Sequence, residues 1–253
     1  MDERFDEKVV LITGGAGALA RVTAQAFADL GATVVLAGRD GERLAEAAAG
    51  IRAEGSKIDW VTVDVANGDQ VAAMVAEVVG RHGGLHIAFN NAGIFGKASP
   101  VGDLDEEVWR TVLDTNLTGM FLSMKHEITH MRANGGGVIV NMASNIGAHG
   151  RRAGMAAYAA SKAAVSVLTQ TAARDHIAEG VRINAVSPGA SDTPMSFRPG
   201  ESRADRDARI GAAVPAGRVS DPAEVAAAVV WLASDASSFV VGHDLVVDGG
   251  ATA

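Results

Sequence analysis

The sequence contains no cysteine. This absence excludes disulfide bonds, thiol nucleophiles, Cys-x-x-Cys redox motifs, and zinc or iron–sulfur sites with cysteine ligands. An excess of positive charge is also lacking, because 22 Lys and Arg stand against 30 Asp and Glu, which gives a net charge of −8. Such a chain has no general attraction for phosphate backbones or anionic lipid. We therefore expect a protein that binds neither nucleic acid nor a membrane.

Long apolar runs are absent as well. The first eight residues, Met-Asp-Glu-Arg-Phe-Asp-Glu-Lys, are charged and lack the apolar centre of a secretory signal. No apolar run approaches the ~18 residues that would cross a bilayer. Proline is scarce, at 6 residues, and aromatic residues make up 4% of a chain that is 48% hydrophobic. These features predict a globular cytoplasmic protein rich in close strand–helix packing.

Short β-branched runs alternate with longer Ala-rich stretches along the whole chain. This alternation predicts βαβ units around a parallel sheet within a single domain, 1–253. The expected strands are Lys8–Thr13, Thr33–Ala37, Ile58–Val63, Leu85–Asn90, Gly137–Met142, Val181–Ser187 and Asp244–Asp248. The expected helices cover about 17–30, 41–54, 68–82, 105–133, 156–179 and 222–234. The segment at about 190–218 is charged and rich in proline, so we interpret it as an irregular, mobile lid over the substrate.

A glycine-rich turn follows the first expected strand. Its sequence, Thr13-Gly-Gly-Ala-Gly-Ala-Leu-Ala20, matches the dinucleotide pattern Gly-x-Gly-x-x-Gly/Ala and leads into a helix. Glycines let the backbone approach a pyrophosphate, and the helix N-terminus supplies free N–H groups. The plain alternative is a tight turn without a ligand. We predict a Rossmann-like, doubly wound, seven-stranded sheet with helices on both faces. Its expected phosphate contacts are Gly14, Gly15, Gly17, Ala18 and Leu19.

The end of the second strand bears on which dinucleotide is bound. The strand ends in Ala37-Gly38-Arg39-Asp40. An acid at this place would bind the ribose 2′-hydroxyl of NAD, whereas an arginine would suit the 2′-phosphate of NADP. We predict NADP, bound through Arg39, with NAD possible. In the alternative, Arg39 is an exposed turn residue and Asp40 binds the ribose.

Further motifs follow in order along the chain. They are Asn90-Asn-Ala-Gly93, Ser144, Tyr158-Ala-Ala-Ser-Lys162, Ser187-Pro-Gly189 and Val247-Asp-Gly-Gly250. Together with the glycine turn they resemble the short-chain dehydrogenase/reductase family in its compact, single-domain form. The resemblance covers essentially the whole chain. It departs from the usual glycine pattern at Ala18 and Ala20, and Ala18 is expected to place a methyl group near the pyrophosphate.

The resemblance implies an NAD(P)-dependent oxidoreductase that interconverts a secondary alcohol and a ketone. Tyr158 would be the general acid/base, Ser144 would hydrogen-bond the substrate oxygen, and Asn116 would hold a water that links Lys162 to solvent. It also implies further cofactor contacts, namely Asp64 and Val65, the run Asn90, Asn91, Ala92 and Gly93, and Pro188, Gly189 and Thr193, besides Tyr158 and Lys162.

The spacing of Tyr158 and Lys162 places both side chains on one face of a helix. A free tyrosine has a pKa of about 10 and is a poor base at neutral pH. We expect the Lys162 ammonium, together with a cationic oxidised nicotinamide, to lower the pKa of Tyr158 toward 7. A different class of function is a cofactor-binding sensor without turnover, which the altered glycine turn favours and the Ser–Tyr–Lys set opposes.

The substrate and the assembly are less specified. The substrate contacts we predict are Ser144, Phe95 and Met195. Other candidates for the pocket are Ile94, His149, Arg151, Arg152, Met155 and Phe197. The two arginines would suit a carboxylate, although a solvated loop is an equal alternative. His126-Glu-Ile-Thr-His130 matches the zinc motif His-Glu-x-x-His, but we expect no metal, because no third-ligand motif follows. The family's pairing helices imply a homotetramer, with a dimer as the alternative.

Overall fold

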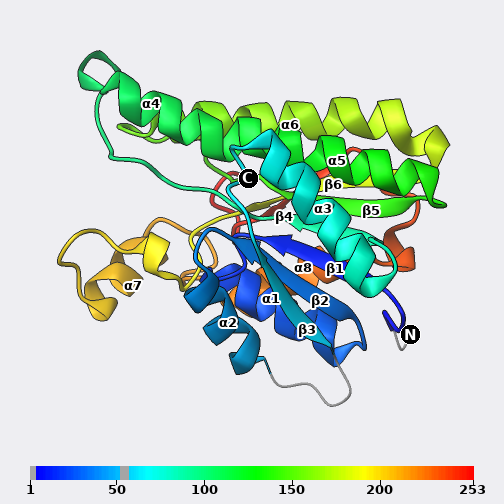
Figure 1. Cartoon of the computed structure of the whole chain (residues 1–253). Helices are drawn as coiled ribbons and strands as arrows, with labels where there is room; N and C mark the ends of the chain where they lie inside the picture. The colour runs from blue at the N-terminus through cyan, green and yellow to red at the C-terminus, as the bar shows by residue number, and fades with distance from the viewer. Residues whose placement is uncertain (1–3, 52–56) are drawn as a thin grey trace.

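The computed structural model describes residues 4–51 and 57–253. Its centre is a seven-stranded parallel sheet in the order β3-β2-β1-β4-β5-β6-β7, with helices on both faces (Figure 1). The strands are β1 Val9–Thr13, β2 Thr33–Gly38, β3 Ile58–Thr62, β4 Ile87–Asn90, β5 Gly137–Met142, β6 Val181–Pro188 and β7 Asp244–Val247. The predicted doubly wound fold is therefore confirmed.

Eight α-helices lie in the described part of the chain. They are α1 Ala18–Asp29, α2 Gly41–Gly50, α3 Gly68–His82, α4 Glu106–Leu113, α5 Gly119–Ala133, α6 Ala156–His176, α7 Arg203–Gly211 and α8 Pro222–Ala233. Short turns lie between some of them: a π-helical turn at Asp114–Thr118 and 3₁₀ turns at Val101–Asp103, Ile177–Glu179, Pro194–Ser196 and Asp235–Ser237.

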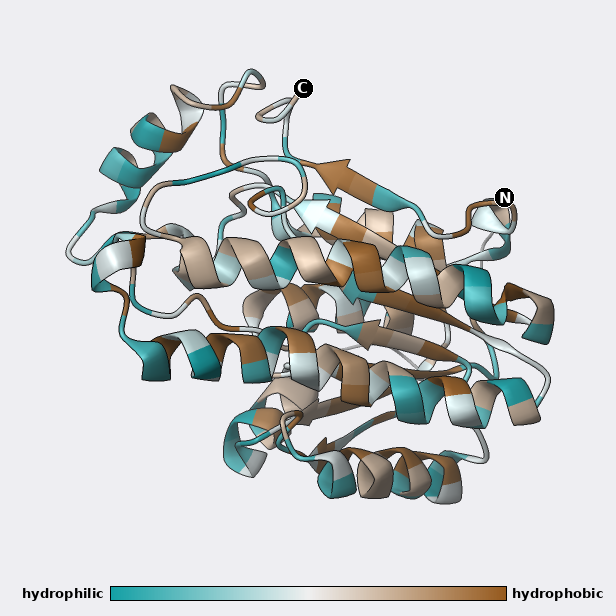
Figure 2. Ribbon diagram, turned by 90° about the horizontal axis from the view of Figure 1, so that it is seen from above, coloured by the Kyte–Doolittle hydropathy of each residue, from teal (hydrophilic) through white to brown (hydrophobic). Residues whose placement is uncertain are grey.

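The sheet separates two apolar layers, because β1 and its neighbours are buried on both faces. Leu11 and Val35 pack with residues of α3, α5 and α6, whereas Ile12 and Leu36 pack with α1, α2 and α8. Figure 2 shows apolar residues along the strands, and helices that carry apolar and polar residues on different sides. Continuous apolar strands of this kind are expected when helices cover both faces.

Three expectations about helices need correction. The predicted helix over 105–133 is two α-helices joined by the π-helical turn at Asp114–Thr118. The predicted helix over 41–54 ends at Gly50, and residues 52–54 lie outside the described part of the chain. The segment at 190–218, expected to be irregular, contains α7, which Ser202 caps by accepting a hydrogen bond from the Asp205 amide. This helix was not predicted because most of its residues are polar or charged, and it buries only Arg206 and Ile210.

Candidate active site

The glycine turn after β1 leaves a helix N-terminus free to bind an anion. Gly17 precedes α1 without a side-chain cap, and the first turn holds no acidic residue. By contrast, α2, α3, α4, α7 and α8 each begin with an Asp, Asn or Ser side chain that accepts a backbone N–H. The first N–H groups of α1 are therefore donors without a side-chain partner, next to the positive end of the helix dipole. This geometry fits the pyrophosphate of a dinucleotide.

The glycines of this turn are required by close backbone contacts. Gly14 has φ +67°, and a Cβ on Gly15 would lie 2.7 Å from Cβ of Leu36. The two departures from the family pattern differ in position. Ala20 is fully buried on the face of α1 that packs into the core, so it serves helix–strand packing. Ala18 is partly exposed as the first residue of α1, where the predicted phosphate contact lies.

The loops after β1 and β4 are joined where the strand order reverses. Asn91 donates through Nδ2 to the Thr13 carbonyl at 3.1 Å, and the Thr13 hydroxyl accepts from the amides of Asn91 and Ala92 at 3.1 and 3.2 Å. Open parallel sheets bind ligands in the crevice at this switch point. A Cβ on Gly93 would lie 3.4 Å from Lys162 Nζ, so this loop also contacts the predicted catalytic lysine.

One cleft of about 170 Å³ brings together three of the four predicted catalytic residues, Ser144, Tyr158 and Lys162. Ser144 lies two residues beyond β5, while Tyr158 and Lys162 lie one turn apart on α6. The cleft is lined by Leu19, Asn91, Gly93, Phe95, Met142, Ala143, Ser144, Asn145, Ile146, Arg152, Tyr158, Lys162, Pro188, Gly189, Ala190, Ser191, Thr193, Met195, Ser196, Arg209 and Ile210. Residues predicted separately for cofactor, catalysis and substrate thus share one cavity.

The expected lowering of the Tyr158 pKa is absent from the protein alone. Burial raises the pKa of Tyr158, because a phenolate loses its hydration there, and the hydrogen bond with Ser144 only partly opposes this. Burial lowers the pKa of Lys162 to about 8. Lys162 Nζ lies 5.9 Å from the centre of the Tyr158 ring and donates instead to the Met142 carbonyl at 2.6 Å. In the protein alone these effects favour the neutral phenol of Tyr158.

Asn116 lies in the π-helical turn and is fully buried. Its Oδ1 accepts from the Ile94 amide at 2.8 Å, and its Nδ2 donates to the Ile94 carbonyl at 2.9 Å and to the Ser161 hydroxyl at 3.1 Å. Single π-helical turns are frequent at functional sites. Here the turn directs Asn116 at the loop after β4, between Gly93 and α6. Its predicted role in holding a water stays a prediction.

The remaining predicted cofactor residues lie outside the cleft, at the carboxyl ends of β2 and β3. Arg39 is exposed immediately after β2. Asp40 is committed to the cap of α2, where its side chain accepts from the Arg43 amide at 3.1 Å. Asp64 is partly exposed two residues after β3. Val65 is buried, and a Cβ on Gly119 would lie 2.8 Å from it.

Several candidates for the substrate pocket have structural partners instead. His149 Nε2 is paired with the buried Asp244 carboxylate at 2.9 Å. Arg151 donates to the carbonyls of Gly147 and Gly150. Phe197 lies under the guanidinium of Arg206, 4.4 Å from ring centre to Cζ. Phe95 does line the cleft and stacks on Tyr158, with ring centres 4.3 Å apart.

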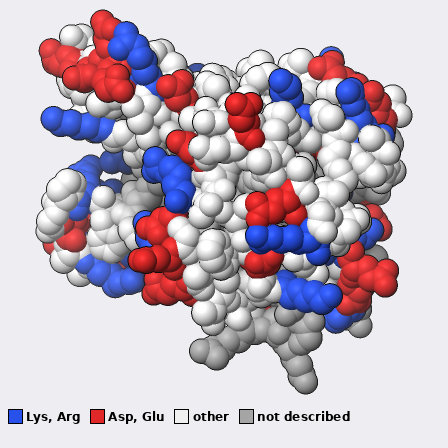
Figure 3. Space-filling model, in the orientation of Figure 1, with Lys and Arg blue, Asp and Glu red and all other residues white. Residues whose placement is uncertain are grey.

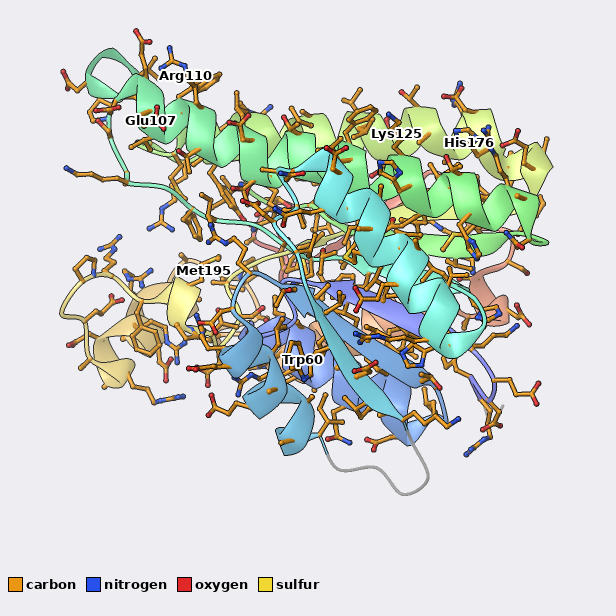
Figure 4. All side chains as sticks on the ribbon, viewed as in Figure 1. Trp60, Glu107, Arg110, Lys125, His176 and Met195 are labelled. Carbon is orange, nitrogen blue, oxygen red and sulfur yellow. The ribbon has the colours of Figure 1, made fainter. Side chains whose placement is uncertain are left out.

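The sequence analysis missed several residues that line the cleft, and two of them, Arg209 and Ile210, come from an element that it did not predict. Both belong to α7, the helix that the charged segment concealed. The signal that could have found them is Ser202 three residues before Asp205, a pattern that often begins a helix. Met195, which was predicted, lies on the same segment as α7, facing the rest of the molecule (Figure 4).

The His126–His130 motif has a structural role for its glutamate. Glu127 is completely buried and accepts from Asn90 Nδ2 at 2.8 Å, while His126 and His130 are partly exposed. Burial raises the pKa of Glu127 to about 7. Glu127 Oε1 and Asn90 Oδ1 have no hydrogen-bond donor among the described residues. A proton on Glu127 supplies a donor for such an acceptor, so we interpret this group as a neutral acid that bridges α5 and β4.

Comparison with known proteins places the chain. A family model described as enoyl-(acyl carrier protein) reductase matches residues 14–252. Cis-4-hydroxycyclohexanecarboxylate dehydrogenase of Sinomonas cyclohexanicum is 43% identical over 254 residues, covering 100% of both chains. The chain belongs to the short-chain dehydrogenase/reductase family. Cyclohexanol dehydrogenase of an Acinetobacter species is another relative, 38% identical over 252 residues. The match covers 100% of this chain and 98% of the relative.

Solved structures agree with this placement. Levodione reductase has a TM-score of 0.94 and 35% identity, covering 98% of this chain and 99% of the other. Xylitol dehydrogenase with bound NAD⁺ has a TM-score of 0.91 and 33% identity, covering 98% and 100%. Gluconate 5-dehydrogenase of Burkholderia cenocepacia, in complex with NADP and tartrate, has a TM-score of 0.91 and 34% identity. The match covers 98% of this chain and 96% of the other. The protein is an NAD(P)-dependent oxidoreductase of alcohols and ketones. In the described residues no helix has the length and apolarity needed to cross a membrane.

Proposed function

We propose that the enzyme interconverts cyclic secondary alcohols and their ketones, with Tyr158 as general acid/base. The observation that carries this proposal is the meeting of Ser144, Tyr158 and Lys162 in one cleft that continues to the free N-terminal end of α1. The relatives act on cyclohexane rings in two cases, by their names. The two named substrates differ in a second functional group, because one carries a carboxylate on the ring and cyclohexanol does not.

The residues have separate tasks in this reaction. When bound, the nicotinamide cofactor would supply the hydride-transfer chemistry. Tyr158 takes the hydroxyl proton in oxidation and returns it to the ketone oxygen in reduction. Ser144 donates a hydrogen bond to that oxygen and stabilises the charge that develops on it. Because burial raises the pKa of Tyr158, the free enzyme holds a phenol, and we expect alcohol oxidation to speed up as pH rises.

NADP is the cofactor we propose, through Arg39. Arg39 is exposed at the end of β2, and no hydrogen bond to its side chain is found among residues 4–51 and 57–253. The competing acid, Asp40, already caps α2. The solved relatives include both an NAD⁺ and an NADP complex. An arginine at this position favours a 2′-phosphate.

Titration with NADPH and NADH tests the cofactor assignment. Trp60 lies on β3 beside the start of α2, with its ring 3.3 Å from a Cβ built on Gly41, so its fluorescence reports on this end of the site (Figure 4). We expect the native enzyme to bind NADPH more tightly than NADH. The Arg39→Ala variant should lose about tenfold in its affinity for NADPH, while its affinity for NADH stays the same. Equal or tighter NADH binding by the native enzyme would assign Arg39 to the turn instead.

The variant Tyr158→Phe separates an enzyme from a cofactor-binding sensor. The substitution keeps the ring that stacks on Phe95 and removes only the proton-transferring hydroxyl. We expect oxidation of a cyclohexanol to fall by about 10²–10⁴-fold, while the affinity for NADPH stays the same. A sensor would show no turnover in the native protein, and its response to the cofactor would survive the substitution.

We also propose a homotetramer. Large apolar side chains are exposed in two separate places: Trp109, Phe121 and Val167 on α4, α5 and α6, and Trp231, Phe239 and Val241 from α8 to the start of β7. Phe239 is fully exposed in the single chain. A tetramer with two kinds of interface needs two such exposed apolar regions. Sedimentation should give about four times 25.8 kDa, and a monomer would refute the assignment.

A further inference from the structure

The cleft that holds Tyr158 has an unusual balance of charge. Its lining includes three cationic side chains, Arg152, Lys162 and Arg209, and contains no aspartate or glutamate. The chain as a whole carries a net charge of −8, so this composition is opposite to that of the molecule. A cleft with cations and no carboxylates attracts an anionic ligand. The question is which of the three cations is available to bind one.

Two of the three already have partners. Lys162 donates to the Met142 carbonyl and lies next to Tyr158. Arg209 forms a two-pronged ion pair with Glu201, at 2.6 Å from Nε and 2.7 Å from Nη2. Within residues 4–51 and 57–253, no hydrogen bond or ion pair is found for the guanidinium of Arg152. Among the described residues, Arg152 is therefore the cation of the cleft whose side chain has no hydrogen-bonding or ionic partner.

The neighbouring arginine shows why Arg152 is well placed. Arg151 uses its guanidinium to hold the loop together, through the carbonyls of Gly147 and Gly150. The turn after Arg152 is braced as well, because Met155 donates to the Arg152 carbonyl at 3.3 Å. Ser99 also donates to the Gly154 carbonyl at 2.9 Å. Arg152 thus lies, exposed, on a hydrogen-bonded loop six residues before Tyr158.

We propose that Arg152 binds a carboxylate on the substrate, so that the enzyme acts on cyclic hydroxy acids and their keto acids. This inference rests on the proposed function, and it names the group that the relatives' names leave open. The carbinol oxygen is held by Ser144 and Tyr158, so the acid must lie elsewhere on the ring. The planar fork of an arginine matches a carboxylate with two parallel hydrogen bonds. The apolar ring would lie against Phe95 and Met195, which line the same cleft.

A pair of substrates tests this assignment. The first is 4-hydroxycyclohexanecarboxylate, and the second is 4-methylcyclohexanol, in which a methyl group replaces the acid. We expect the native enzyme to favour the acid in kcat/KM. The variant Arg152→Gln should reduce the ratio of the two values by roughly 10–100-fold, the range for losing a charged hydrogen-bonding partner. Arg152→Lys should retain part of the preference, because it keeps the charge and loses the fork.

The variant Lys57→Gln is the matched control. Lys57 is an exposed cation immediately before β3, at the amino end of the sheet, whereas the cleft lies at the carboxyl ends. It removes the same unit of charge, and the substrate ratio should stay within about twofold. A native enzyme that oxidises both alcohols equally, or an Arg152→Gln ratio like that of the control, overturns the inference and leaves the proposed function standing. Oxidation of neither alcohol overturns both. Weaker NADPH binding by Arg152→Gln, with an unchanged ratio, assigns Arg152 to the cofactor and also overturns it.

Discussion

The two sides of the cleft are held together by different forces. The sheet and its helices bury apolar side chains, and Phe27, Phe89 and Leu36 are fully buried between the layers. The segment at 190–218 encloses charge instead, with Arg206 only 1% exposed between Asp192 and Ser196. In Figure 3 acidic and basic side chains lie close together over this segment. Salt screens ion pairs, whereas apolar burial involves no charge that salt could screen.

This difference indicates that the body and the segment at 190–218 contribute differently to the cleft. The proposed catalytic residues Ser144, Tyr158 and Lys162 and the glycine turn after β1 belong to the apolar body, where packing fixes geometry. Met195, Arg209 and Ile210 reach the cleft from the charged segment. A segment held mainly by its own ion pairs can open without unfolding the body, as expected for a part that admits substrate. The following predictions test this division.

The largest effect is expected from Phe27→Ala in the body. Phe27 is fully buried on α1 and meets Phe5 edge to face, with ring centres 5.2 Å apart. Its loss leaves a cavity between α1 and the sheet and should lower the free energy of unfolding by about 3–5 kcal/mol. Urea denaturation followed by circular dichroism measures this. The loss should be the same in low and high salt; a loss under 1 kcal/mol, or one that salt removes, would contradict the role assigned to apolar burial.

Glu127 is the charged exception within the body, and it should make stability depend on pH. Its folded pKa of about 7 lies above the ordinary value of 4.5, because burial disfavours the carboxylate. The folded state therefore binds the proton more tightly. The associated stability is fully present below pH 4.5 and is lost as pH rises through 7. The shift corresponds to roughly 3 kcal/mol.

The variant Glu127→Gln should remove this dependence. An amide can accept from Asn90 and donate to it without titrating, so unfolding curves at pH 5 and pH 8 should nearly coincide. Glu107→Gln, on the exposed side of α4, is the matched control and should leave the native pH dependence intact (Figure 4). If the native protein is equally stable at pH 5 and pH 8, Glu127 is not the neutral acid we infer.

The same contrast explains what could be read from the sequence. All seven strands followed from alternation, because apolar strands with helices on both faces allow few arrangements. The pairing of Tyr158 with Lys162 followed from their spacing, whereas the place of Ser144 beside them was implied by the resemblance to the family. Helix α7 did not follow from the pattern of the sequence, since its buried side is largely an arginine, which hydrophobic periodicity cannot register. The raised pKa of Tyr158 was also missed, because spacing gives proximity to Lys162 and says nothing about desolvation.

A local effect is expected from Asp192→Asn in the charged segment. Asp192 pairs with Arg206 at 3.0 Å and with Arg203 at 2.7 Å, and Arg206 would lose a charged partner while remaining buried. The segment should open more often, so that protease cleavage within 190–218 becomes roughly tenfold faster while the melting temperature of the body stays nearly constant. High salt should produce part of the same effect in the native enzyme. A fall in melting temperature without faster cleavage would show that segment and body unfold as one unit.

The smallest effect should come from an ion pair on the surface of the body. Arg110 and Glu106 are paired one turn apart on α4, 2.5 Å between nitrogen and oxygen, with side chains 60% and 82% exposed. Water screens such a pair, and holding two long side chains costs entropy, so Arg110→Gln should change the free energy of unfolding by less than about 0.5 kcal/mol. Urea denaturation at low and high salt checks this. Both Arg110→Gln and Asp192→Asn neutralise one member of an ion pair. A difference between their effects therefore reports on whether the remaining partner is buried or exposed. If Arg110→Gln instead accelerated cleavage of the 190–218 segment, the ion pairs of the molecule would act as one network, and the division between body and segment would fail.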